Sequence, residues 1–462
     1  MNTVVQKAGD IFLSTRERKL LTLSAVSLAA VYVFCIVCLD PSDDIPVFYG
    51  NWLSLRSGEL PYVDFSFGNP PLSLLFIAIP GALSSDLQGY YCLHAAEMMI
   101  LAWSSVYLVM KISGRLGLNR FRTTALYFVV LLMYSEELVK KLDMAVAITV
   151  LLALYMFLQR RFTLSYATLI IGAMIKVYPA VLIPVFMMVN LADRSDPRRF
   201  RNVAAGLAVI AAAAAIAFAA MGVCGLSVDR VVDVFTQQAG RDFQIESVMG
   251  NILQIFGMLG LYSYELVGRS YTYNVECAPA DALSGCWVIV TVAAYILLMW
   301  AVWHFRLRTD TGPADRDRVL VLSSASAVLV VLLTFMIFST QYMLWIITLL
   351  PFVIQGEKDT KKRRTLQSLY LLQFVILVPL MLWLLFGSGE AFAAASVFVR
   401  NMMLLFHPAV LHRGDNGPPH RDEDGKHLTD ADYGFVWHSM RASSSISRVR
   451  TVRGPGSDCS SA

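Results

Sequence analysis

The sequence predicts an all-α polytopic membrane protein, a bundle of about twelve transmembrane helices with external juxtamembrane helices. Apolar residues make up 56% of the chain and charged residues 16%, whereas soluble domains carry about 45–50% and about 25%. Most of these apolar residues form uninterrupted runs long enough to cross a bilayer. The net charge of +4 lies in loops and tails, so a nucleic-acid partner gains no support.

Clusters of basic residues separate the apolar runs and orient the chain through the positive-inside rule. With every cluster cytoplasmic, both termini are cytoplasmic and the predicted spans are residues 20–39, 89–110, 122–136, 143–159, 162–177, 179–192, 203–222, 286–305, 319–338, 341–355, 367–386 and 390–406. We therefore expect a cytoplasmic N-terminus over 1–19 and a transmembrane domain over 20–406. The polar, Gly-, Ser- and Pro-rich residues 407–462 are expected to form a disordered cytoplasmic tail.

Two external segments are long, residues 40–88 and 223–285. Within the first, Pro70–Leu83 is apolar but shorter than a span, and counting it as one would place basic residues outside. We expect it to be a helix on the outer leaflet that begins at its two prolines. At the end of the second, Cys277 and Cys286 flank a polar stretch and are compatible with a disulfide or with two free thiols.

Polar residues that suit chemistry collect on the outer side under this topology. The first external loop carries Asp40, Asp43, Asp44 and Asp64 among aromatic residues, and such carboxylates can act as bases, bind a metal or be solvated. Lys140 and Lys141, just before Asp143, lie in a short loop that this topology places outside, contrary to the positive-inside rule. Such exceptions can mark sites that bind anions.

Lys176 stands at the apex of two short apolar segments that are interrupted at Tyr178-Pro179. The first segment has about fourteen residues before Lys176. As a helix that rises ~1.5 Å per residue it spans only about 21 Å, less than the ~30 Å thickness of the hydrocarbon core of a bilayer. We expect a re-entrant hairpin facing a polar cavity, with snorkelling of Lys176 to the interface as the alternative.

Further polar residues follow in two places on the same side. The second external segment holds Arg241, Gln244, Glu246 and Ser247 before an amphipathic stretch, and an external turn at residues 338–345 (FSTQYMLW) holds Ser339, Gln341 and Tyr342. Arginine can clamp a phosphate with two hydrogen bonds, whereas lysine acts more as a point charge.

Five segments resemble, in order, the GT-C glycosyltransferases, above all the bacterial polyprenol-phosphate-mannose-dependent mannosyltransferases. These segments are 58–72 (GELPYVDFSFGNPPL), 141–161 (KLDMAVAITVLLALYMFLQRR), 174–179 (MIKVYP), 240–248 (GRDFQIESV) and 338–345 (FSTQYMLW). The resemblance implies that an aspartate in the first loop is the general base, with Asp44 matching best and Asp43 its rival. It implies substrate-binding roles for Asp64, Asp143, Lys176, Tyr178, Arg241, Gln244, Glu246, Gln341 and Tyr342.

The implied reaction transfers a sugar, mannose or similar, with inversion from a polyprenyl phosphate to an acceptor hydroxyl at the outer face of the cytoplasmic membrane. The acceptor is a glycolipid, a polysaccharide or a protein. No cofactor is implied, and no ligand spacing demands a metal. Two other classes compete: a secondary transporter or flippase for a lipid-linked or anionic substrate, and a non-catalytic envelope scaffold. The transporter predicts pathway charges on both faces and often internal repeats, and neither is seen in the sequence.

Overall fold

The structure, a computed structural model, describes residues 13–223, 225, 242–269, 272–308, 312–375 and 389–412. Of these residues, 77% are helical and very few lie in strands, which confirms the predicted fold class. The described residues also contain one feature that was not predicted, an antiparallel hairpin of β1 (Glu265–Arg269) and β2 (Thr272–Glu276) in the second external segment.

The first half of the chain supplies seven helices of the bundle: α2 (Thr15–Cys38), α5 (Leu87–Arg115), α6 (Arg120–Met133), α8 (Asp143–Leu158), α9 (Phe162–Ala173), α10 (Leu182–Leu191) and α11 (Arg199–Val223). Local sequence sets where several of them begin. Ser14 and Glu17 form a reciprocal capping box at α2, and the Asn119 side chain accepts from the backbone N–H of Arg122 at 2.9 Å.

The described residues of the second half supply four more long helices: α14 (Ala278–Val302), α15 (Pro313–Thr334), α18 (Thr360–Val375) and α20 (Glu390–His412). A π-helical turn, η2 (Trp303–Leu307), continues α14. The predicted span 341–355 is instead three short pieces: η3 (Thr340–Tyr342), α16 (Met343–Ile347) and α17 (Leu350–Gly356). Pro351 at the start of α17 suits this break, because proline is tolerated in the first turn of a helix and not inside one.

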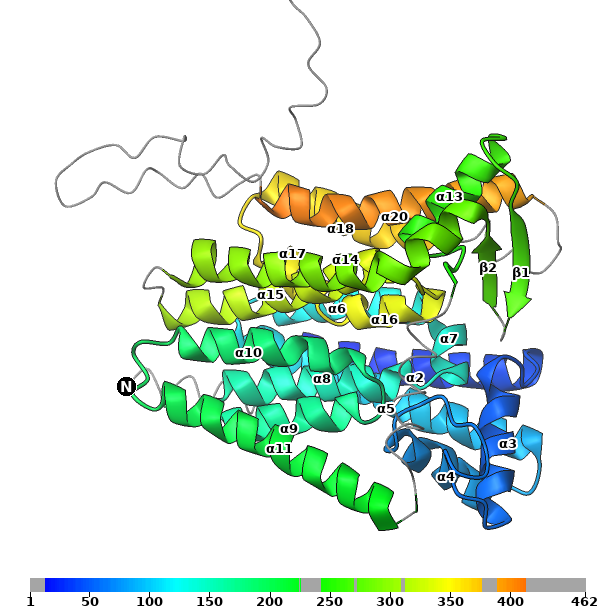
Figure 1. Cartoon of the computed structure of the whole chain (residues 1–462). Coiled ribbons are helices and arrows are strands. Elements are labelled where there is room, and N and C mark those ends of the chain that lie inside the picture. Colours follow the sequence, from blue (N-terminus) through cyan, green and yellow to red (C-terminus); the bar gives the residue numbers. More distant parts are fainter. Residues whose placement is uncertain are drawn as a thin grey trace, which may run out of the picture. The chain divides into compact units, whose positions relative to one another are not determined.

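Only five described helices are long and apolar enough to cross a membrane by themselves: α2, α5, α11, α15, and α14 with its π-helical turn. The predicted count of about twelve is therefore not confirmed. Part of the difference arises because the predicted span 367–386 lies partly outside the described residues. Another part arises because α8, α9 and α10 are shorter apolar helices, with 16, 12 and 10 residues. Figure 1 shows these three packed side by side with α11.

Short elements gather at one end of the bundle: α3 (Asp44–Arg56), α4 (Ser73–Leu83), α7 (Ser135–Lys140), α13 (Val248–Met258) and the hairpin (Figure 1). The expected outer helix exists as α4 but begins at Ser73, because Pro70 and Pro71 form the turn before it. Helix α3 was not predicted. It packs on α4, where a Cβ added to Gly81 would lie only 2.3 Å from the Trp52 ring.

The apolar core has two parts. The larger fills the helical bundle, and a smaller one joins α13, β2, the start of α14 and the first half of α20 through Phe243, Leu253, Val275, Ala280 and Val397. Cys277 belongs to the smaller core, and both it and Cys286 are free thiols. The free-thiol alternative therefore holds.

Candidate active site

Two lysine–aspartate ion pairs join the loop after α2 to the segment between α7 and α8. Lys140 Nζ lies 3.4 Å from Asp43 Oδ2, and Lys141 Nζ lies 3.2 Å from Asp44 Oδ1. Lys140 also donates to Ser42 Oγ and to Glu136 Oε1, both at 2.9 Å. Asp44 is the first residue of α3, where the helix dipole favours a negative charge.

A third pair lies deeper in the protein. Asp143, the first residue of α8, is fully buried, and Lys176 Nζ lies 2.7 Å from its Oδ2. Its Oδ1 accepts a 2.7 Å hydrogen bond from the indole N–H of Trp345. Both oxygens of this buried carboxylate are thus satisfied, which is the condition for keeping a charge inside a protein.

Three aromatic rings stack beside this pair. Trp345 lies between Tyr178 and Tyr342, with ring centroids 4.2 and 4.3 Å apart, and Lys176 Nζ is 5.2 Å from the centre of the Tyr342 ring. The buried hydroxyl of Tyr178 has no hydrogen-bond partner among the described residues. The stack fixes the orientation of Trp345 and therefore of the Asp143 carboxylate.

The ion pairs belong to one cluster. The Asp44 carboxylate is close enough to Lys176 to interact with its charge, and Glu246 is similarly close to Lys141. The backbone N–H of Leu72 donates to the carbonyl of Met174 at 2.8 Å, which ties the first loop to the turn that carries Lys176. Sequence analysis predicted this turn as the apex of a hairpin, and α9 and α10 do meet there.

Glu137, on α7 outside the predicted spans, is a carboxyl that sequence analysis did not select. Burial raises its pKa to about 8; Lys141 opposes this rise, and Glu246, Asp43 and Asp143 add to it. Burial also opposes a charge on Lys141, but Asp44 and Glu137 outweigh it and leave the pKa of Lys141 above its ordinary value. The cluster thus contains a carboxyl that is neutral at pH 7 beside a lysine that is charged.

A second network holds the polar residues of the second external segment. Glu246 Oε2 accepts from Thr340 Oγ1 at 2.6 Å and lies 3.4 Å from Arg400 Nη1. Arg400, on α20, is fully buried, donates to the Glu246 carbonyl at 2.5 Å and lies 4.2 Å from the centre of the Phe338 ring. Sequence analysis missed Arg400, although an arginine inside a predicted span is itself a signal of function.

The remaining predicted residues fall in three groups. Gln244 donates to Ser339 Oγ at 3.0 Å, and the buried Oε1 of Gln341, nearby in sequence, has no hydrogen-bond partner among the described residues. Asp64 is exposed and accepts from the backbone N–H of Leu60 at 2.7 Å, so it closes a local turn instead of joining the ion pairs. Arg241 lies outside the described residues.

No group of three or more His, Cys, Asp or Glu residues that could hold a metal ion is found in the described part of the chain. The arrangement combines carboxylates, lysines and stacked aromatic rings at one end of the bundle. Such a set can remove a proton from a hydroxyl and stabilise a phosphate.

A comparison with models of protein families identifies the family of this chain. The model of glycosyltransferase family 87 matches residues 67–339, which is more than half of the sequence. The chain belongs to glycosyltransferase family 87. This is a GT-C-type family, which confirms the predicted superfamily and establishes the chain as a membrane glycosyltransferase.

The matched range of family 87 includes Asp143, Lys176, Tyr178, Gln244 and Glu246. It begins after Asp43, Asp44 and Asp64 and ends before Gln341 and Tyr342. No curated protein matches the chain.

Among solved structures, this family 87 protein is similar to the crystal structure of ArnT from Cupriavidus metallidurans bound to undecaprenyl phosphate. The TM-score is 0.46 and the sequence identity is 15%, with 84% of this chain and 76% of that chain covered.

Proposed function

We propose that this family 87 glycosyltransferase moves a sugar, mannose or similar, from a polyprenyl phosphate to an acceptor hydroxyl, with inversion, at the outer face of the cytoplasmic membrane. The observation that carries the proposal is the meeting of Asp44 with two cations. Asp44 is paired with Lys141 at 3.2 Å and lies within electrostatic range of Lys176. The proposal makes Asp44 the base and assigns the binding of the phosphate to the two lysines.

In the proposed reaction, Asp44 accepts the proton of the acceptor hydroxyl. The hydroxyl oxygen forms a bond to the anomeric carbon while the bond from that carbon to the phosphate oxygen breaks. The bonding electrons leave with the polyprenyl phosphate, and attack opposite the leaving group inverts the configuration. Asp44 is partly exposed, with one third of its side chain accessible, so an acceptor can reach it.

In this proposal, Lys141 and Lys176 stabilise the negative charge of the leaving phosphate. Its charge grows as the sugar departs, and cations held in place before the reaction stabilise that charge at no cost of reorganisation. Asp143 pairs with Lys176 and is itself held by the indole N–H of Trp345, so the ammonium is oriented before the donor binds. Part of the Lys176 side chain, 19%, is still accessible.

Helix α4 offers a route for the lipid tail. Leu75, Ile79 and Leu83 lie on this short helix, and more than half of each side chain is exposed. Because α4 packs on α3, which carries Asp44, a polyprenyl chain lying along these residues would keep its phosphate near the ion-pair cluster.

Asp44 is preferred to Asp43 on geometry. Asp43 is more exposed and shares Lys140 with Ser42 and Glu136, whereas Asp44 pairs with Lys141 and also interacts electrostatically with Lys176. The cations that would receive the phosphate thus lie on the Asp44 side of the cluster.

The test is the transfer of labelled mannose from polyprenyl-phosphate mannose by purified protein in lipid. General-base catalysis contributes roughly 10²–10⁴-fold, so Asp44→Asn should lose that factor in kcat. Asp43→Asn, a matched change at the neighbouring position, should keep most of the activity.

Full activity of a folded Asp44→Asn protein would show that Asp44 is not the base. Loss of activity in Asp43→Asn alone would assign the base to Asp43. Movement of the labelled lipid across the bilayer without sugar transfer would instead support the transporter alternative. Membership of a glycosyltransferase family favours transfer.

A further inference from the structure

A pocket of about 440 Å³ lies at the end of the bundle away from the ion-pair cluster. Its walls come from the segment between α10 and α11 and from the residues flanking α8, α9 and α15, and they include Arg160, Asp193, Arg198 and Arg201. Helix α8 begins at Asp143 and ends two residues before Arg160, while α10 runs back from the Lys176 turn to Asp193. The pocket and the candidate active site therefore lie at opposite ends of the same helices.

The acidic side chains of this pocket already have partners. Asp193 forms an ion pair with Arg316 and accepts from Ser195, and Asp196 accepts from Asn202 Nδ2 at 2.8 Å. Arg160 likewise pairs with Asp317, with its Nη1 3.1 Å from Oδ1. These contacts hold the walls in place and leave the carboxylates of the pocket already paired.

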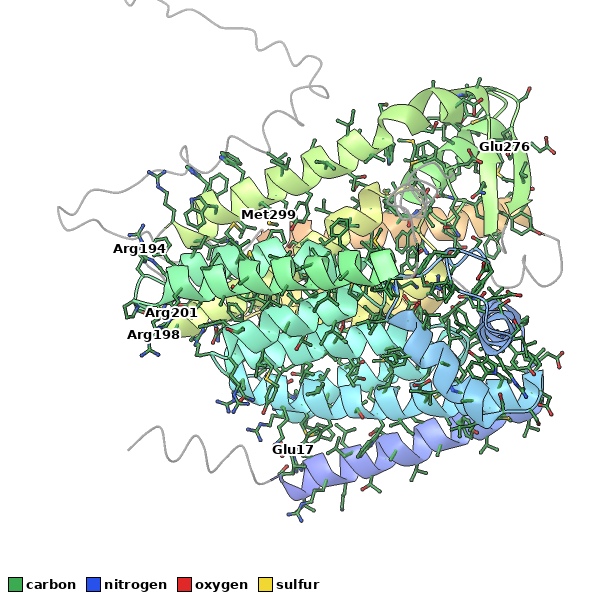
Figure 2. The ribbon with its side chains drawn as sticks, turned by 60° about the horizontal axis from the view of Figure 1, so that its bottom comes forward. Glu17, Arg194, Arg198, Arg201, Glu276 and Met299 are labelled. Atoms are coloured by element: carbon green, nitrogen blue, oxygen red, sulfur yellow. The ribbon has the colours of Figure 1, made fainter. Side chains whose placement is uncertain are left out.

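Arg198 and Arg201 take no part in these ion pairs. Both line the pocket, both are exposed, and neither has an ion-pair partner among the described residues. Figure 2 shows them at the same end of the molecule as Arg194, with Glu276 of the hairpin at the other end. Two guanidinium groups on one wall of a formed pocket suit a phosphate, which arginine binds through paired hydrogen bonds.

The surroundings of the pocket indicate a lipid. Helix α11 starts at Arg199, packs on α9 and α10, and has Gly206 as its only buried residue. Its apolar side chains Phe200, Leu207, Ile216 and Phe218 are 55–70% exposed, so the helix that leaves the pocket carries exposed apolar side chains along its length. A ligand with an anionic head and acyl chains fits both parts, and basic pockets at this level of a membrane protein bind such headgroups.

We propose that this pocket binds the phosphate headgroup of an anionic phospholipid in the leaflet opposite the candidate active site, through Arg198 and Arg201. The proposal stands independently of the proposed function.

The test compares purified protein in nanodiscs that contain equal amounts of phosphatidylglycerol and phosphatidylcholine. Native mass spectrometry then measures which lipid stays bound. The wild type should retain phosphatidylglycerol selectively, and Arg198→Ala with Arg201→Ala should weaken that retention roughly tenfold or more, since each charged hydrogen bond contributes about a factor of ten.

The control variant is Arg194→Ala with Arg308→Ala. It removes the same charge from exposed arginines at the same end that do not line the pocket. It should behave as the wild type, and equal thermal unfolding of both variants shows that folding is intact.

Three results would overturn the proposal. The first is equal loss of phosphatidylglycerol in the control variant, which would indicate a diffuse charge effect. The second is equal retention of the two lipids by the wild type. The third is binding of inorganic phosphate that depends on Arg198 and Arg201 without any lipid preference, which would indicate a soluble anion.

Discussion

At the scale of the residue, the decisive feature is a carboxylate that is buried together with its cation. Asp143 has no exposed surface, yet both of its oxygens have donors, Lys176 and the indole of Trp345. Removing one partner of such a pair leaves the other charge buried and uncompensated, whereas removing both need not be costly. This asymmetry separates the structural role of Lys176 from its proposed role at the phosphate.

Lys176→Met should therefore destabilise the protein by about 3–5 kcal/mol, because Asp143 loses its counter-charge. The double variant Asp143→Asn with Lys176→Met should recover much of that stability and yet remain inactive, since the cation for the phosphate is absent. Thermal unfolding in detergent and the mannose-transfer assay measure the two effects. Activity in the stable double variant would contradict the proposed role of Lys176.

Glu137 gives a pH prediction. Its pKa of about 8 in the folded protein exceeds the value of about 4.3 in an unfolded chain. Its contribution to stability is thus greatest below the unfolded value and is lost as the pH rises through about 8. Above that pH the new negative charge also competes for Lys141.

We expect kcat/KM to fall on the alkaline side with an apparent pKa near 8. Glu137→Gln, which cannot ionise, should remove that fall while keeping activity at pH 7. A pH–rate profile of both proteins measures it, and an unchanged alkaline fall in Glu137→Gln would assign the titration to another group.

At the scale of the element, α3 matters because it carries Asp44 at its first position. Its placement depends on α4, where Gly81 allows the Trp52 ring to approach closely. Glycine inside a helix is otherwise unfavourable by about 1 kcal/mol relative to alanine. The close packing of Trp52 on α4 therefore explains why a glycine stands at position 81.

Gly81→Ala should push Trp52 and α3 away from α4 and lower kcat severalfold by misplacing Asp44. Gly50→Ala is the matched control, because Gly50 lies in α3 and an added Cβ there meets nothing within 4 Å. The control should be neutral or slightly stabilising. Steady-state kinetics of both variants test this, and equal kinetics would show that α3 tolerates the shift.

Helix α20 joins distant elements at the same end of the molecule. Its Arg400 holds the carbonyl and the carboxylate of Glu246, and its Glu390 accepts from Gln254 at 3.1 Å and from Tyr264 at 3.0 Å. Asn251 on α13 also donates to the Ala394 carbonyl at 3.0 Å. The helix thus fixes α13 and the segment before it against the turn that carries Gln341.

At the scale of the whole molecule, the ion-pair cluster and a group of exposed arginines lie at opposite ends. The site end holds the aspartates of the first loop, and the other end holds Arg194, Arg198 and Arg201. By the positive-inside rule we expect the arginine end to be cytoplasmic, and the proposed active site would then face outward.

This orientation predicts opposite labelling at the two ends. In a variant with its native cysteines replaced by serine, Glu59→Cys should react with a membrane-impermeant maleimide in intact right-side-out vesicles. Arg194→Cys should react only after the membrane is opened; both positions are exposed. The reverse pattern would place the proposed site in the cytoplasm.

The sequence alone determined the features that depend on neighbouring residues. Apolar runs between basic clusters predicted most of the long helices, the break at Tyr178-Pro179 predicted the turn that carries Lys176, and the ordered motifs predicted the superfamily. Local pattern suffices here, because helix formation and insertion into lipid depend on residues a few positions apart.

Only the tertiary structure decided which charges meet. It pairs Lys141 with Asp44, leaves Asp64 in its own turn, and joins Arg400 to Glu246 across 154 positions. It also broke the predicted span 341–355 and placed Trp345 against Asp143. The physical reason is that a buried charge selects its partner by the packing of whole helices, and no periodicity along the chain encodes that packing.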